Sequence, residues 1–158
     1  MKFLIAFLAA ALLSTSALAQ NLFYGTNLTG ANQVPPVVTP ISGQFLFRTS
    51  DNRWYLAVKD APMDDKITAA HIHCGKVGEN GPVVYPFWTT PPSRRIYPKG
   101  QFNDSKFVRY TPDPTCPFLI RNIRQLKFAI ERGYIYVNVH TEKHPAGTVR
   151  GQVTSFFP

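Results

Sequence analysis

Short stretches in which apolar and polar side chains alternate recur along this chain, and they restrict its fold more than any other feature. Successive side chains of a strand point to opposite faces, so a two-residue period predicts strands that pack one face against a core. Fourteen prolines and ten glycines separate these stretches and favour turns between them. The predicted strands are Asn21–Thr29, Gly43–Thr49, Arg53–Lys59, Ile67–His73, Val83–Trp88, Tyr134–His140 and a closing hairpin at Thr148–Phe156.

One segment carries a helical period instead. Within Phe118–Arg132, the apolar residues Ile123, Leu126 and Ile130 recur at the spacing of one helix face. Pro117 suits the first turn of this helix and Gly133 suits its end. The sequence therefore predicts a single helix.

The stretch Thr89–Thr115 is rich in proline and keeps no sustained period, so it is predicted to be a long insertion with one strand at Lys106–Tyr110. The cluster Ser50–Asn52 predicts a tight turn that joins the strands on either side of it into a hairpin. Many short strands with one helix predict an all-β fold, an antiparallel β-sandwich or flattened barrel.

The first nineteen residues have the pattern of a secretory signal peptide. A positive start at Lys2 is followed by the apolar run Phe3–Leu13 and by the small residues Ala17–Ala19, after which cleavage is predicted. The run is too short to span a bilayer, and no later run is long enough. We expect a secreted mature chain of residues 20–158 that forms one domain without a transmembrane segment.

The chain is basic, with 17 lysines and arginines against 9 acidic residues. Removal of the leader lowers the formal net charge from +8 to +7, and the basic residues are spread along the chain rather than clustered. This charge is compatible with an acidic polysaccharide as partner, whereas nucleic acid is not expected to meet an exported protein.

Two cysteines, Cys74 and Cys116, would enter an oxidising compartment, where a single disulfide between them is expected. Such a bond stabilises the fold by roughly 4 kcal/mol if it acts by restricting the unfolded chain. The alternative is that Cys74, next to His73, serves as a thiolate ligand of a metal ion.

The four histidines include three that the strand period places on polar faces. His71 and His73 are two residues apart and share one face, and His140 lies opposite the aliphatic face of its own strand, together with Asn138. If the two strands share a sheet, three imidazoles meet on its outer, solvent-exposed surface. His144, in the loop that follows, is a fourth candidate.

Nitrogen-rich sites of this kind suit copper or zinc, so His71, His73, His140 and His144 are the predicted metal ligands. Asn138 and Thr141 are predicted to brace them. The alternative is that the histidines serve the fold by hydrogen bonding to Asn138, Thr141 or Thr148, without a metal.

Arg150 shares the polar face of the last hairpin. It is expected either to hold an anion near His140 or to form cross-strand hydrogen bonds. No Ser/His/Asp arrangement, paired carboxylates or phosphate-binding loop stands out, so no catalytic residue is assigned and a hydrolase is not expected.

Three motifs resemble the CHRD domain, the repeat first named in chordin. They are Leu28–Val37 (LTGANQVPPV), Ala70–His73 with Asn80–Val84 (AHIH and NGPVV), and Gly133–Thr141 with His144–Gln152 (GYIYVNVHT and HPAGTVRGQ). Their order and spacing agree from Leu22 to Val153. The resemblance implies an extracellular β-sandwich module with an extracellular protein as partner. Cys74 and the Thr89–Thr115 stretch depart from the family pattern, which implies a disulfide that pins this insertion.

A second resemblance, to copper/zinc superoxide dismutase, concerns the order of His71, His73, His140 and Arg150. It implies that the histidines bind copper and that Arg150 guides an anion. The predicted sandwich is immunoglobulin-like or superoxide-dismutase-like. The bridging histidine and the zinc loop of that family have no match here. Two functions follow: a binding or structural module without turnover, or a copper carrier or superoxide dismutase-like enzyme.

Overall fold

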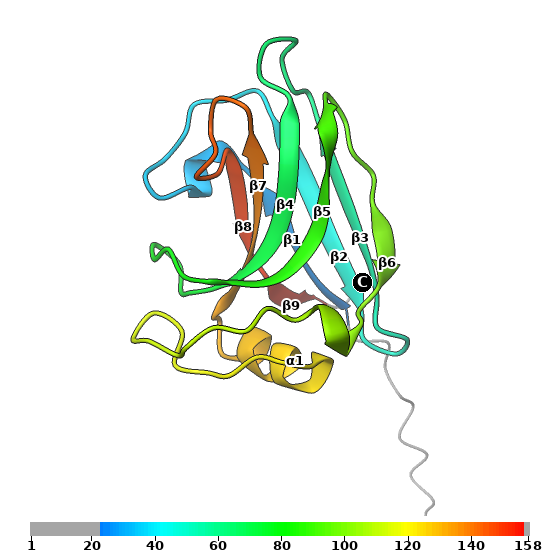
Figure 1. Cartoon of the computed structure of the whole chain (residues 1–158), viewed down its shortest axis with the longest axis vertical. Helices are drawn as coiled ribbons and strands as arrows, with labels where there is room; N and C mark the ends of the chain where they lie inside the picture. The colour runs from blue at the N-terminus through cyan, green and yellow to red at the C-terminus, as the bar shows by residue number, and fades with distance from the viewer. Residues whose placement is uncertain (1–22, 157–158) are drawn as a thin grey trace, which may run out of the picture.

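The computed structural model describes residues 23–156 as two antiparallel sheets packed face to face (Figure 1). The predicted signal peptide, with its cleavage site, lies outside the described residues. Among the residues described, no helix is long and apolar enough to cross a membrane. The predicted all-β sandwich is confirmed.

One sheet has five strands. In spatial order they are β6 (Lys99–Gln101), β3 (Arg53–Lys59), β2 (Ser42–Arg48), β1 (Phe23–Leu28) and β9 (Thr154–Phe156). The predicted hairpin is present, because β2 pairs with β3 from Ser42 opposite Lys59 to Arg48 opposite Arg53. Residues 49–52 form the turn.

The other sheet has four strands, in the order β5 (Val83–Ser93), β4 (Ile67–Cys74), β7 (Ile135–Thr141) and β8 (Val149–Gln152). Its inner face is aliphatic, since Ala70 and Ile72 of β4 lie opposite Val139 and Val137 of β7 and all four are buried. The alternation in both strands therefore leaves polar residues on the outer face.

Aromatic residues fill much of the space between the sheets. Phe45 of β2 lies 5.3 Å from Phe87 of β5, measured between ring centroids, and Trp54 of β3 lies 4.6 Å from the same ring. Burial of a ring of this size stabilises the fold by about 2–3 kcal/mol. The aromatic content of the sequence is thus concentrated where the two sheets meet.

The helix is shorter than predicted. Helix α1 spans Ile123–Glu131, and its first turn is capped by Asn122, whose side chain accepts a hydrogen bond from the backbone of Gln125. Pro117 lies outside the helix because the Tyr110 hydroxyl donates a hydrogen bond to Phe118 O and accepts one from the backbone N–H of Ile120. Those bonds hold the residues before Asn122 in an irregular conformation.

The insertion also differs from the prediction. Residues 106–110 form no strand: a short 3-10 turn, η2 (Asp104–Lys106), is followed by irregular chain. The strand of this region is β6 instead, and β5 continues to Ser93. In Figure 1 the irregular chain and α1 lie together across one end of the sandwich.

The last predicted hairpin divides between the sheets. The two strands do not pair with each other as predicted: β8 pairs with β7, whereas β9 crosses to the other sheet and pairs with β1. Val153, between the two strands, is fully buried, so the chain changes sheets at the edge of the core.

A disulfide joins Cys74, at the end of β4, to Cys116 in the irregular chain before α1. The predicted pairing is confirmed, and the described residues contain no free cysteine. Cys74 therefore cannot serve as a thiolate ligand, and the bond fastens the insertion to the sandwich.

Candidate metal centre

Three of the four histidines meet on the outer face of the four-stranded sheet. In the β4–β7 register, His71 lies opposite Asn138 and His140 lies opposite Ala69, so the two histidines are diagonal neighbours on one face. One potential ligand atom from each of His71, His73 and His140 lies within 4.8 Å of the others. The prediction that these imidazoles converge is confirmed.

The site is less exposed than the sequence predicted. His73 is only 9% exposed, and His71 and His140 are half-buried. The outer face is covered by three loops (residues 30–37, 75–82 and 144–147), each of which hydrogen-bonds to side chains of this face. The loops turn a sheet surface into a partly enclosed site.

Backbone carbonyls set the tautomer of two imidazoles. Nδ1 of His73 lies 3.0 Å from Gly81 O, and Nδ1 of His140 lies 2.9 Å from Pro145 O. A carbonyl oxygen only accepts, so each Nδ1 carries the hydrogen and donates it. In the neutral ring, Nε2 is then left with a free lone pair.

The lone pair of His73 is unused by the part of the chain that the structure describes. Its Nε2 is buried and has no hydrogen-bond partner among the described residues. Burying a polar atom without a partner costs free energy, and such an atom calls for a specific explanation. A cation bound by this nitrogen would supply one.

His71 completes the group. Its Nδ1 lies 3.0 Å from Nε2 of His140. Two imidazole nitrogens that bind one tetrahedral ion at about 2.0 Å are separated by about 3.3 Å, close to the separation seen here. Without a metal, the same geometry is a hydrogen bond from His71 Nδ1–H to His140 Nε2.

Burial keeps the three imidazoles neutral. It is the largest cause that lowers the pKa of His71 and of His73 to about 4, with the neighbouring His140 as a further cause for both. Burial likewise lowers the pKa of His140, against the hydrogen bond to Pro145. At neutral pH all three rings therefore offer a lone pair rather than a positive charge.

Asn138 and Thr141, the residues predicted to brace the site, hydrogen-bond to the loops around it rather than to the imidazoles. Among the described contacts, neither Asn138 nor Thr141 hydrogen-bonds an imidazole. Asn138 accepts from Gln33 Nε2 at 2.5 Å and donates to Ala146 O at 3.3 Å, which ties down the turn next to Pro145. Thr141 instead accepts from the backbone of His144.

That turn also needs a glycine. Gly147 has a φ of 132°, and a β-carbon there would lie 2.5 Å from Asn138 Oδ1. The turn therefore packs directly on the side chain that holds it, and it presents the Pro145 carbonyl to His140.

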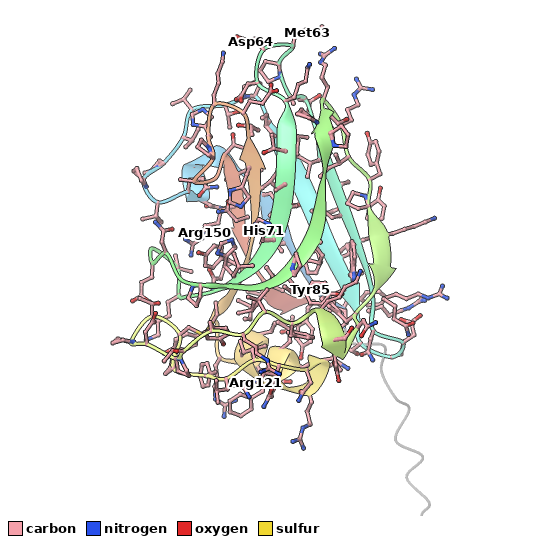
Figure 2. All side chains as sticks on the ribbon, in the orientation of Figure 1. Met63, Asp64, His71, Tyr85, Arg121 and Arg150 are labelled. Atoms are coloured by element: carbon pink, nitrogen blue, oxygen red, sulfur yellow. A yellow bond between two sulfur atoms is a disulfide. The ribbon has the colours of Figure 1, made fainter. Side chains whose placement is uncertain are left out.

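Arg150 does not face solvent. It is 2% exposed, its guanidinium carbon lies 3.5 Å from the centre of the Tyr136 ring, and its Nη atoms donate to Lys76 O and Asn80 Oδ1. Tyr136 also stacks on His73, with 5.0 Å between ring centroids. Arg150 thus holds the loop over the site, which corrects the expectation that it guides an anion from solvent. His71 and Arg150 are both labelled in Figure 2.

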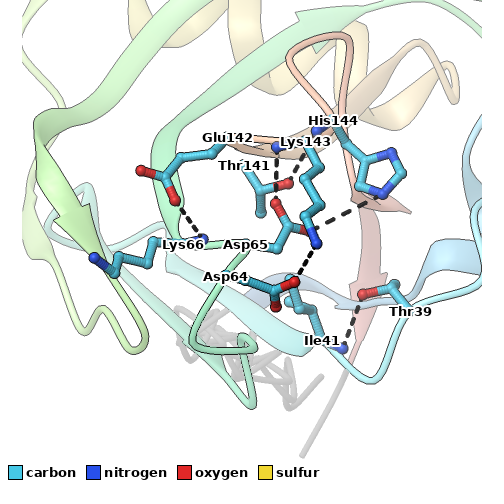
Figure 3. A network of polar contacts seen from close by, with 9 residues as sticks. All are labelled: Thr39, Ile41, Asp64, Asp65, Lys66, Thr141, Glu142, Lys143 and His144. Atoms are coloured by element: carbon cyan, nitrogen blue, oxygen red, sulfur yellow. Dashed lines mark hydrogen bonds and ion pairs between the residues drawn. The ribbon is translucent and has the colours of Figure 1, made fainter.

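His144 is not part of the group, which corrects the predicted fourth ligand. Figure 3 shows its imidazole turned toward Asp65, with 4.0 Å between Nε2 and Oδ2. The loop is held there by Asp65, which accepts from the Lys143 backbone at 2.8 Å, and by the ion pair of Lys143 with Asp64. These contacts keep His144 away from the other three histidines.

The model of the CHRD domain family matches residues 24–153. The chain belongs to the CHRD domain family. No curated protein and no solved structure matches it. The matched region contains the histidine cluster, Arg150 and both cysteines, so the candidate site lies within the CHRD domain itself.

Sequence reasoning missed the groups that orient the imidazoles in this CHRD domain. Gly81 and Pro145 act through backbone carbonyls, which no side-chain pattern reveals, and Gln33 reaches Asn138 from a distant loop. Tyr136 had a signal, because strand parity places it on the face of Asn138 and His140.

Proposed function

We propose that this protein is a secreted CHRD module that binds one copper or zinc ion through His71, His73 and His140. The observation that carries the proposal is the buried Nε2 of His73, which lacks a partner within residues 23–156 while its ring is oriented by Gly81 O. Two further imidazoles lie within reach of the same ion.

The donor set favours these two metals. Three neutral imidazoles suit copper or zinc, whereas calcium and magnesium prefer oxygen ligands. Histidine ligands commonly donate their second ring N–H to a carbonyl or carboxylate, which fixes ring orientation. His73 and His140 both have such a carbonyl partner.

Binding is favoured over turnover. A superoxide dismutase-like enzyme needs a cation that draws the substrate anion to the metal, but Arg150 is buried and already hydrogen-bonded to the 75–82 loop. An extracellular location is supported by the CHRD family, by the disulfide and by the leader-like residues 1–19.

Calorimetric titration of untagged residues 20–158 with Cu²⁺ and Zn²⁺ tests this function. We expect one ion per chain for the wild type and no saturable uptake for His71→Ala/His73→Ala. His144→Ala is the matched control, because it removes an imidazole outside the group, and it should bind like the wild type.

Thermal unfolding of each variant verifies that it is folded. Failure of the wild type to take up either ion, or equal uptake by the folded double variant, would disprove the proposal. A superoxide assay on the copper-loaded protein then separates a carrier from an enzyme.

A further inference from the structure

A groove of about 510 Å³ lies on the outer face of the five-stranded sheet, on the sheet that does not carry the histidines. Its side chains come from β1, β2, β3 and β6. The lining residues are Phe23, Leu46, Arg48, Arg53, Tyr55 and Lys99, with Trp54, Gly100 and Gln101. The volume is within the range of small-ligand sites.

The sheet register arranges these side chains in two neighbouring rows. One row crosses the sheet from Phe23 through Arg48 and Arg53. The next row runs through Leu46, opposite Tyr55, which is itself opposite Lys99. Leu46 and Tyr55 thus form an apolar centre. Arg48 and Arg53 flank it in the neighbouring row, and Lys99 flanks it on the next strand.

Among the described residues, a single carboxylate offsets the charge of the three cations Arg48, Arg53 and Lys99. Arg48 and Arg53 lie directly opposite each other, a pairing of like charges that weakens a sheet. Both contact the same carboxylate, Asp51, at 2.5 Å and 3.5 Å. Lys99 has no ion pair among the described residues, so the groove keeps an excess of positive charge.

We propose that this groove binds an acidic saccharide, a sugar chain that carries carboxylate or sulfate groups. The apolar face of a sugar ring packs on Tyr55 and Leu46, and its anionic groups meet Arg53 and Lys99. Tyr55 is 37% exposed and Arg53 is 71% exposed at its side chain, so both are accessible.

Other ligand classes fit less well. An acyl chain needs an enclosed tunnel, whereas this groove is an open hollow on a single sheet. A small inorganic anion would not use the apolar side chains of the groove, and a neutral sugar would not use its cations. The overall excess of basic over acidic residues adds long-range attraction for an anionic chain.

Calorimetry of residues 20–158 with a heparin-derived octasaccharide at 0.15 M salt tests the site. We expect Arg53→Gln/Lys99→Gln to weaken binding about tenfold or more, because two charge-assisted contacts are lost. Tyr55→Leu should weaken it about fivefold, whereas Tyr55→Phe should stay within about twofold because it keeps the stacking face.

The matched control is Arg109→Gln/Arg121→Gln, which removes two exposed charges outside the groove and should change affinity by less than about twofold. Equal loss in this control would mean diffuse charge attraction and would overturn the proposal. So would equal affinity for polyglutamate, or binding to anionic vesicles with the same residue dependence but none to the octasaccharide. His71→Ala/His73→Ala should bind the saccharide like the wild type, which separates this site from the metal site.

Discussion

At the scale of single residues, the histidine site depends on the orientation and protonation of its three rings rather than on their number. His73 is constrained most: its ring stacks on Tyr136, its Nδ1 donates to Gly81 O, and its Nε2 is buried with no partner among the residues described. A solvated histidine satisfies both nitrogens with water, whereas Nε2 of His73 is buried away from bulk solvent. The same burial that makes the ring a good ligand also makes it costly to protonate.

This cost predicts how stability depends on pH in the metal-free protein. The pKa of His71 and His73 is about 4 in the folded state and about 6.5 in the unfolded chain, so the unfolded state binds more protons between these values. Stability should therefore fall as pH decreases from 6.5 to 4. We expect the unfolding free energy to fall by on the order of 2 kcal/mol. This is less than the full pKa shifts imply, because His71 is partly exposed.

Urea unfolding at a series of pH values measures this dependence. His71→Ala/His73→Ala should flatten the slope between pH 4 and 6.5, whereas His144→Ala should leave it in place. A wild type whose stability is constant over this window would show that the rings are not held neutral by burial.

At the scale of structural elements, strands place the imidazoles and loops orient them. Strands β4 and β7 bring the three rings to one face, but the carbonyls that fix two of them belong to the 75–82 and 144–147 loops. Arg150 of β8 joins the sheet to the 75–82 loop, because it contacts Tyr136 on the sheet and hydrogen-bonds to Lys76 and Asn80 in the loop.

We therefore predict that Arg150→Ala lowers both stability and metal affinity. Loss of a buried side chain and two hydrogen bonds should cost about 3 kcal/mol of unfolding free energy. Release of the loop that carries Gly81 should weaken metal binding about tenfold. Arg150→Lys should not restore either property, because one ammonium cannot stack flat and serve two acceptors at once.

Arg132→Ala is the matched control for thermal unfolding and metal titration. Arg132 also lies over an aromatic ring, Phe128, at 3.4 Å, but it is exposed and stands at the end of α1, outside the three loops that cover the histidines. Its loss should cost less than about 0.5 kcal/mol. Wild-type metal affinity in a folded Arg150→Ala variant would refute a role of Arg150 in holding the site.

At the scale of the whole molecule, the two proposed sites lie on the two opposite outer faces of the sandwich. The four-stranded sheet presents the imidazoles, and the five-stranded sheet presents the cationic groove. The irregular chain before α1 lies across one end and is fastened to β4 by the Cys74–Cys116 bond.

Removal of this bond should destabilise the entire domain. The disulfide joins residues 42 positions apart, so Cys74→Ala/Cys116→Ala should lower the unfolding free energy by about 4 kcal/mol, because the unfolded chain gains freedom. Denaturant titration with and without dithiothreitol measures the effect. The wild type should lose a similar amount on reduction, whereas a double variant that still responds to reductant would contradict this explanation.

Much of the fold could be predicted because strand parity is a local property. The period-two pattern located most strands of the sandwich, and it placed His71, His73 and His140 on polar faces. It failed where local patterns compete with long-range contacts. The helix begins late because Asn122 caps it and Tyr110 holds the preceding chain, and β9 leaves its hairpin because β1 offers an open edge.

The sequence alone determined a β-sandwich of the CHRD type, the disulfide partners and which histidines share a polar face, because all of these follow from residue type, spacing and motif order. Only the tertiary structure decided which histidines meet, that Arg150 is buried between Tyr136 and the 75–82 loop, and that His144 turns to Asp65. Those outcomes depend on strand register and on loops that pack over the sheet. Both are set by contacts between residues far apart in the chain, which no local pattern records.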